Sequence, residues 1–246
     1  KTSLFSLLAA AVVGAVSFLT LSAKNPATAN EAVRLRLDLD RTVLPAGSTE
    51  KAVIKISLDG MRLPRPEERP PVNLALVIDR SGSMSGDKIE KAREAALEAL
   101  SRLAADDILS VIAYDSDVET LVPAQRVGDG RRIAAAIRGI RVNGNTALFG
   151  GVSQGAAEVR KHLESRRYVH RVILLSDGQA NVGPASPDDL GRLGAALMKE
   201  GISVTTIGLG LGFNEDLMTR LAQRSDGNTY FVESSEDLPN IFAGEL

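Results

Sequence analysis

The hydrophobic positions change their spacing near residue 72, and each spacing predicts a different kind of structure. Between residues 33 and 58, apolar and polar residues alternate in the runs VRLRLDLD and AVIKISL, which is typical of half-buried strands. The segment LPAGSTEK between these runs supplies turn-forming residues. We therefore expect a β hairpin. Because a two-stranded hairpin is marginal in water by itself, we expect it to pack against other structure.

From residue 72 onward, short apolar runs alternate with segments of helical spacing. The run VNLALVID at 72–79 is almost continuously apolar, as in a parallel strand that is buried on both faces. Similar runs follow at 108–114, 171–177 and 202–210, with helical patterns between them. This alternation predicts an α/β fold: a doubly wound, mostly parallel sheet flanked by helices, preceded by the short hairpin.

The first 29 residues differ from the rest in composition. After Lys1 an uncharged, apolar stretch runs from Leu4 to Leu21, and Ala27-Thr28-Ala29 has the A-x-A pattern of a cleavage site. The segment is predicted to be either a cleaved signal peptide or an uncleaved membrane anchor through residues 4–21. Both interpretations predict an exported protein, periplasmic or extracellular.

Composition also suggests where the domains begin and end. The segment MRLPRPEERPP holds four of the chain's ten prolines, as expected of a linker with solvated arginines. The predicted organisation is a signal peptide or anchor at 1–29, a hairpin appendage at 30–60, a Pro-rich linker at 61–71 and one α/β domain at 72–246.

Charge and cysteine content exclude several classes of function. The chain has 29 basic and 31 acidic residues, for a net charge of −2, which argues against nucleic acid as a partner. It has no cysteine and two histidines. Disulfides, thiolate nucleophiles and Cys-ligated metals are therefore excluded, and oxygen ligands remain the credible way to hold a metal.

Oxygen-bearing side chains follow two of the predicted strands. Asp79, Ser81 and Ser83 alternate after the first buried strand, and Asp177 follows the run RVILLS. Alternate residues of an extended chain face one side, and ligands of doubly wound sheets bind beyond the carboxyl ends of the strands. Oxygen donors without nitrogen or sulfur predict a divalent cation: Mg²⁺ first, with Mn²⁺ and Ca²⁺ as alternatives.

These residues also carry a family resemblance. DRSGSM at 79–84, Thr146 in NGNT and Asp177 in LLSDG closely resemble the metal-ion-dependent adhesion site of von Willebrand factor type A domains. The resemblance runs from about Val72 to Leu246 and is strongest to the branch of secreted bacterial proteins and inter-alpha-trypsin-inhibitor heavy chains.

The resemblance implies a role for each matching position. Ser81 and Ser83 would bind the metal through their hydroxyls, Thr146 would join them in one state of the site, and Asp79 and Asp177 would act directly or through water. A protein partner's Asp or Glu carboxylate would complete the coordination. The implied function is metal-dependent protein binding of the adhesion type, and not catalysis.

Two alternatives remain open. A haloacid-dehalogenase-like Mg²⁺ phosphohydrolase would use Asp79 as nucleophile, but that family needs a second Asp where this chain has Ser81. A purely structural interaction domain would leave the metal site empty or merely stabilising.

The remaining polar candidates are expected to carry no site. Asp115 and Asp117 are interpreted as turn residues at the rim, and the glycines of GLGLG as a loop. The other candidates are expected to be solvated: His162, His170, Arg166, Arg167 and Arg171.

Overall fold

The computed structural model describes residues 33–39, 51, 53–60, 69–164, 167–210 and 213–246. It divides into two compact units, Lys1–Glu67 and Glu68–Leu246. The predicted signal peptide or anchor at 1–29 lies outside the described residues, as do residues 61–68 of the predicted linker. Within the described ranges, no helix combines the length and the apolar composition needed to cross a membrane.

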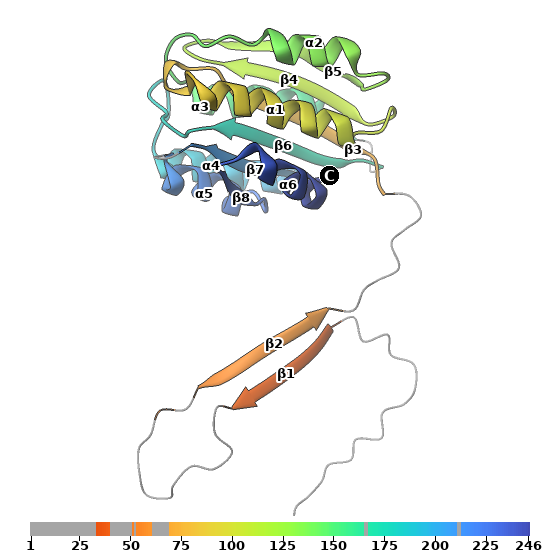
Figure 1. Cartoon of the computed structure of the whole chain (residues 1–246), viewed down its shortest axis with the longest axis vertical. Coiled ribbons are helices and arrows are strands. Elements are labelled where there is room, and N and C mark those ends of the chain that lie inside the picture. Colours follow the sequence, from red (N-terminus) through yellow and green to blue (C-terminus); the bar gives the residue numbers. More distant parts are fainter. Residues whose placement is uncertain (1–32, 40–50, 52, 61–68, 165–166, 211–212) are drawn as a thin grey trace, which may run out of the picture. The chain divides into compact units, whose positions relative to one another are not determined.

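The first unit contains the predicted hairpin. Its antiparallel strands are β1 (Val33–Leu39) and β2 (Ile54–Gly60) (Figure 1). Leu35 lies opposite Leu58, and Leu37 lies opposite Ile56, so these four side chains share one face of the hairpin. They are between 59% and 69% exposed, which leaves the apolar face of the hairpin open to solvent.

The second unit is built on a six-stranded sheet of order β5-β4-β3-β6-β7-β8 (Figure 1). All neighbouring strands are parallel except the edge pair β4 and β5. The strands are β3 (Val72–Asp79), β4 (Ile108–Tyr114), β5 (Val118–Arg126), β6 (Val169–Ser176), β7 (Ile202–Leu209) and β8 (Thr229–Val232). The predicted fold class, a mostly parallel doubly wound sheet preceded by a hairpin, is confirmed.

Helices cover both faces of this sheet (Figure 1). One core joins α1, α2 and α6 to one face, and a second core joins α3, α4 and α5 to the other. The helices are α1 (Asp87–Arg102), α2 (Arg131–Gly139), α3 (Leu148–Arg160), α4 (Pro187–Lys199), α5 (Glu215–Arg224) and α6 (Leu238–Glu245), with short 3-10 turns at Gly82–Met84 and Ser235–Asp237. Strands buried on both faces explain the continuous apolar runs of the sequence.

Local sequence rules account for several of the helix and strand limits. Ser186 accepts a hydrogen bond from the Asp189 N–H while the Asp189 carboxylate accepts from Ser186, and these two bonds form a capping box at the start of α4. The edge strand β5 extends to Arg126, and it tolerates Pro123 because an edge strand has unpaired N–H positions.

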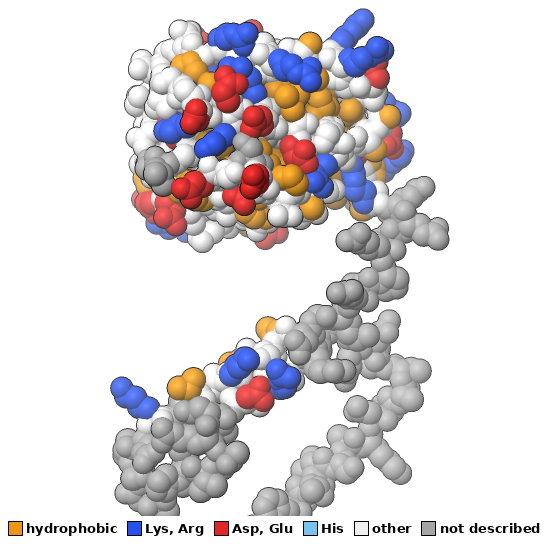
Figure 2. All heavy atoms as spheres, viewed as in Figure 1, with side chains coloured by type: hydrophobic (Ala, Val, Ile, Leu, Met, Phe, Trp, Pro, Cys, Tyr) orange, Lys and Arg blue, Asp and Glu red, His pale blue; other side chains and the backbone are white. Residues whose placement is uncertain are grey.

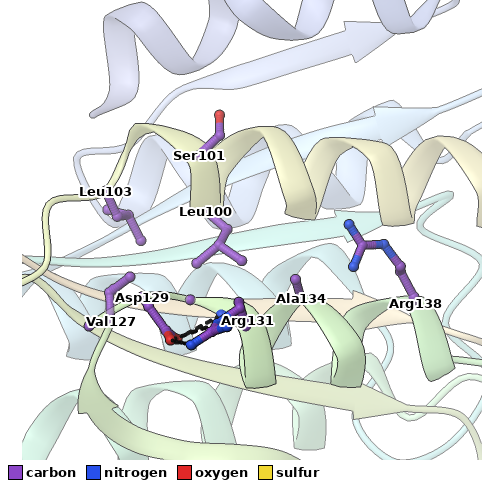
Figure 3. Close-up of a pocket in the computed structure, with 10 residues that line it drawn as sticks. Leu100, Ser101, Leu103, Val127, Asp129, Arg131, Ala134 and Arg138 are labelled. Carbon is purple, nitrogen blue, oxygen red and sulfur yellow. Dashed lines mark hydrogen bonds and ion pairs between the residues drawn. The ribbon is translucent and has the colours of Figure 1, made fainter.

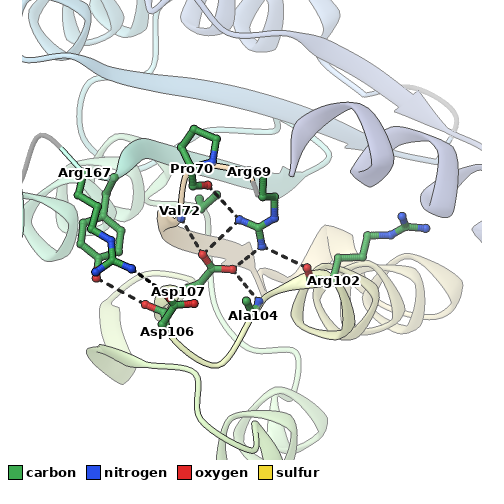
Figure 4. A network of polar contacts seen from close by, with 9 residues as sticks. Arg69, Pro70, Val72, Arg102, Ala104, Asp106, Asp107 and Arg167 are labelled. Atoms are coloured by element: carbon green, nitrogen blue, oxygen red, sulfur yellow. Dashed lines mark hydrogen bonds and ion pairs between the residues drawn. The ribbon is translucent and has the colours of Figure 1, made fainter. Parts of the chain in front are cut away.

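A buried carboxylate fixes the chain where it enters the sheet (Figure 4). The Asp107 side chain is fully buried and accepts hydrogen bonds of 2.7 Å from the N–H groups of Val72 and Ala104. Arg69 donates to both of its oxygens. Burial by itself would raise the pKa of Asp107, but these bonds hold it below its ordinary value. The expectation of solvated linker arginines is therefore wrong for Arg69.

Two further residues that were expected to be solvated instead contact other side chains. Arg171 on β6 pairs with the fully buried carboxylate of Glu245 on α6, and His170 Nδ1 lies 3.1 Å from the Asn73 amide nitrogen. The sequence did not reveal these contacts because the partners are 74 and 97 residues away.

Candidate metal centre

The candidate residues meet where the sheet reverses its direction of winding. After β3 the chain returns through α1 to β4 on one side, and after β6 it returns through α4 to β7 on the other. Since β3 and β6 are parallel neighbours, their carboxyl ends flank this switch point, where doubly wound sheets bind ligands. Asp79 ends β3, and Asp177 directly follows β6.

Two serine hydroxyls connect these strand ends. The Ser81 and Ser83 Oγ atoms lie 3.2 Å apart, and Ser83 Oγ donates to Asp177 Oδ1 at 3.2 Å. Neighbouring oxygens around an octahedral Mg²⁺ with bonds of 2.0–2.1 Å lie about 3 Å apart. The spacing of these oxygens and their hard donor chemistry therefore fit a small divalent cation.

Asp79 lies beneath this hydroxyl cluster and is held by three donors. Ser176 Oγ donates to Asp79 Oδ2 at 2.6 Å, Tyr114 OH donates to the same oxygen at 3.2 Å, and the Ser81 N–H donates to Oδ1 at 2.9 Å. Burial raises the pKa of Asp79, against the hydrogen bonds from Ser176 and Ser81 that lower it. Both carboxylate oxygens are thereby fixed in direction.

Thr146 reaches the same hollow from the loop before α3. It is buried, its N–H donates to Asn181 Oδ1 at 2.8 Å, and its carbonyl accepts from the Asn181 N–H at 3.1 Å. The Gly82 N–H donates to the Gly144 carbonyl at 3.0 Å, which ties this loop to the serine turn. A cavity of about 440 Å³ is lined by Ser83, Thr146 and Asp177, among others.

The structure thus brings Asp79, Ser81, Ser83 and Asp177 into one chain of hydrogen bonds and places Thr146 on the wall of the same cavity. Carboxylates and histidines alone would not reveal the place, because the described residues contain no group of three or more such side chains that could hold a metal ion. Hydroxyl groups are essential to the set.

Three further residues belong to this neighbourhood and were not predicted from the sequence. Tyr114 and Ser176 hold Asp79, and Lys88 Nζ donates to Asp177 Oδ2 at 2.7 Å. Tyr114 and Ser176 lie on neighbouring strands whose register the sequence does not reveal. Lys88 has a visible signal, because it lies in the first turn of α1, where the helix dipole disfavours a cation.

The rim on the β4 side is closed by ion pairs. Arg80 Nε donates to Asp115 Oδ2 at 2.7 Å, and Arg80 Nη1 donates to Glu119 Oε2 at 2.9 Å. Asp115 also accepts from the Asp117 N–H, as expected of a turn residue. Burial would raise the pKa of Asp115, but this backbone bond and Arg80 hold it below its ordinary value. Asp115 is therefore already neutralised within the rim.

A second hollow, of about 410 Å³, lies between α1 and α2 (Figure 3). Its lining includes Leu100, Leu103 and Ala134, and its one carboxylate, Asp129, pairs with Arg131 at 2.6 Å. The hollow is lined by none of the candidate residues at the switch point, and it offers no second acidic side chain for a cation.

The family model of the von Willebrand factor type A domain matches residues 73–244. The chain belongs to the von Willebrand factor type A family. The match includes every candidate metal-site residue from Asp79 to Asp177, and it confirms the resemblance that the motifs predict.

Relatives of this type A domain chain come from bacteria and animals. It is 35% identical over 176 residues to the uncharacterized protein sll0103 of Synechocystis, covering 72% of this chain and 41% of the relative. It is 29% identical over 180 residues to human inter-alpha-trypsin inhibitor heavy chain H3, and the match covers 68% of this chain and 20% of the relative. The chain thus spans less than half the length of these relatives.

Solved structures share the type A fold. A von Willebrand factor type A protein from Catenulispora acidiphila has a TM-score of 0.62 at 20% identity. The match covers 86% of this chain and 48% of that protein. Proximal thread matrix protein 1 from the mussel byssus, with a zinc-occupied MIDAS motif, has a TM-score of 0.55 at 19% identity. The match covers 70% of this chain and 46% of the mussel protein.

Proposed function

We propose that this type A domain binds a protein partner through a divalent cation. Ser81, Ser83 and Thr146 would hold the ion through hydroxyls, and Asp79 and Asp177 would hold it directly or through water. An Asp or Glu side chain of the partner would complete the coordination. Mg²⁺ is the proposed ion, because hydroxyl, carboxylate and water oxygens suit it.

The position of the Ser83 hydroxyl is the main support for this proposal. It lies 3.2 Å from both Ser81 Oγ and Asp177 Oδ1 and so joins the ends of two neighbouring strands. Neutral hydroxyls would supply much of the coordination of a cation bound there, and a carboxylate is the protein group best suited to complete it. Family membership and the zinc-occupied MIDAS of the mussel relative support the same conclusion.

Surface charge also favours a local site over long-range electrostatic attraction. On the face seen in Figure 2, Lys and Arg side chains alternate with Asp and Glu over the second unit, and apolar groups lie between them. A surface of mixed sign exerts little long-range field. Recognition would therefore depend on the few groups around the cavity and on the ion that they hold.

The test compares thermal unfolding in Mg²⁺ and in EDTA. Because an ion that binds only the folded state stabilises it, Mg²⁺ should raise the melting temperature of the wild type. Ser81→Ala and Asp177→Ala should abolish this rise, whereas Ser101→Ala, on the exposed face of α1, should preserve it.

Partner capture provides the second part of the test. A partner held through the ion should be retained by the wild type in Mg²⁺, released by EDTA and lost with Ser81→Ala. Equal retention in EDTA would instead support an interaction domain that needs no metal. Release of phosphate from small phosphate esters, abolished by Asp79→Asn, would support the phosphohydrolase.

We propose an exported location from residues 1–29, with the apolar stretch at 4–21 as signal peptide or tether. Cell fractionation of the tagged protein tests this proposal. Recovery of the wild type in the cytosol, equal to that of a variant lacking residues 1–29, would contradict it.

A further inference from the structure

Lys88 shares the Asp177 carboxylate with the serine cluster. Its Nζ lies 2.7 Å from Asp177 Oδ2, while the other carboxylate oxygen, Oδ1, accepts from Ser83 at 3.2 Å. The Asp177 side chain is fully buried, and Lys88 is 27% exposed. Asp177 thus faces the candidate ion on one side and an ammonium group on the other.

The position of Lys88 is fixed by its surroundings. Its methylene chain runs along Gly210, where an added Cβ would lie 3.0 Å from Lys88 Cε. Lys88 lines the same cavity as Ser83 and Thr146. A cation in the first turn of a helix is disfavoured by the helix dipole, and such violations of a local rule are expected at functional sites.

The formal charges show what Lys88 adds. Asp79 and Asp177 together contribute two negative charges, and Lys88 contributes one positive charge. With a divalent cation the group would carry one net positive charge, whereas without Lys88 it would be neutral. One carboxylate from a partner would neutralise the loaded site only when Lys88 is present.

We infer that Lys88 determines the specificity of the metal-loaded site for a carboxylate, an inference that rests on the proposed function. An ammonium group has three donors, and the bond to Asp177 uses one of them. Lys88 opposes the cation by charge repulsion and attracts the anionic group that completes the coordination. It therefore weakens the affinity for the metal and strengthens the affinity for an acidic partner.

Opposite effects on two affinities distinguish this role from a structural one. The variants are Lys88→Gln, which removes the charge, and Lys88→Arg, which keeps it. Titration of Mn²⁺ alone measures the first affinity. Propionate, the free equivalent of a glutamate side chain, measures the second through the fall in water proton relaxation when it displaces water from bound Mn²⁺; uncharged propionamide is the control ligand.

We expect Lys88→Gln to bind Mn²⁺ about three- to tenfold more tightly, and to bind propionate more weakly by a similar factor at saturating Mn²⁺, as loss of one nearby charge implies. Lys88→Arg should resemble the wild type in both measurements. Circular dichroism and melting temperature would verify that both variants fold.

Weaker Mn²⁺ binding by Lys88→Gln would overturn the inference, because Lys88 would then serve to position Asp177. Unchanged propionate binding by a Mn²⁺-saturated Lys88→Gln variant would also overturn it. Failure of the wild type to bind Mn²⁺ at all would refute the proposed function itself, and with it the basis of the inference.

Discussion

Ser176 donates a hydrogen bond of 2.6 Å to Asp79 across the junction of β6 and β3. The bond joins the last residues of two parallel strands that lie next to each other at the switch point. Together with Tyr114 from β4, it gives Asp79 a hydrogen-bond donor from each neighbouring strand. The sheet itself therefore orients the carboxylate that lies beneath the candidate cation.

Tyr114→Phe tests this support of Asp79. Removing the hydroxyl leaves a buried carboxylate with one donor fewer, which should lower the free energy of unfolding by about 1–2 kcal/mol. Mg²⁺ affinity should also fall, because Asp79 would be less firmly oriented. Urea denaturation and calorimetric titration measure the two effects.

Tyr168→Phe is the matched control, because the Tyr168 hydroxyl lies 3.5 Å from its acceptor, the Asp106 carbonyl, in a partly exposed place. It should change neither quantity. Equal stability of the wild type and Tyr114→Phe, with unchanged Mg²⁺ affinity, would show that Tyr114 does not support the site.

Gly151→Ala tests the packing behind the site. A Cβ at Gly151 in α3 would lie 2.5 Å from the ring of Tyr114, and a buried ring has little room to move. We expect a loss of about 2 kcal/mol from overpacking, in excess of the gain in helix propensity. The free energy of unfolding from urea titration measures this.

Gly244→Ala provides the comparison within the same fold. It lies in α6, is exposed and has no atom within 4 Å of an added Cβ. The propensity gain should remain, and stability should rise by about 0.5–1 kcal/mol. If both alanine variants changed stability in the same direction, contact with Tyr114 would not be the cause.

Much of the fold could be predicted because its signals are local. A strand buried on both faces must be apolar throughout, as VNLALVID is, and the capping box at Ser186 needs only neighbouring residues. Asp79 and Asp177 were identifiable because each stands at the end of such a strand, where the fold places its ligands.

The contacts between distant residues could not be predicted. Arg171 and His170 were expected to be solvated. Their partners, Glu245 and Asn73, become neighbours only when the register of the strands and the position of α6 are fixed. The same holds for the contact of Lys88 with Asp177, 89 residues away. Sequence spacing identifies groups that could meet, and packing decides which of them do.

The lowered pKa of Glu245 implies a specific dependence of stability on pH. Burial by itself would raise the pKa of Glu245, but hydrogen bonds from Thr205, Asn228 and Tyr230, with the charge of Arg171, hold it below the ordinary value of 4.5. A lowered pKa in the folded state stabilises the protein above the unfolded-state pKa. This contribution is lost as the pH falls from about 4.5 through the folded-state value.

Glu245→Gln should therefore be about 3 kcal/mol less stable than the wild type at pH 7, since it leaves Arg171 without its charged partner. The difference should shrink as the pH falls below about 4.5. Urea titrations of both proteins between pH 7 and 3 measure it, with the exposed Glu236→Gln as control. A difference that stays constant over this range would contradict the role assigned to the Glu245 charge.

Calorimetric titration of the wild type and Ser83→Ala with Mg²⁺ determines whether these residues bind a divalent cation. Ser83 links Ser81 to Asp177 through contacts of 3.2 Å, so its hydroxyl is the donor whose loss should most affect the ion. We expect one Mg²⁺ per wild-type chain and at least about tenfold weaker binding by Ser83→Ala, the loss expected for about 1.4 kcal/mol. Absence of binding by the wild type, or equal binding by both proteins, would contradict this expectation.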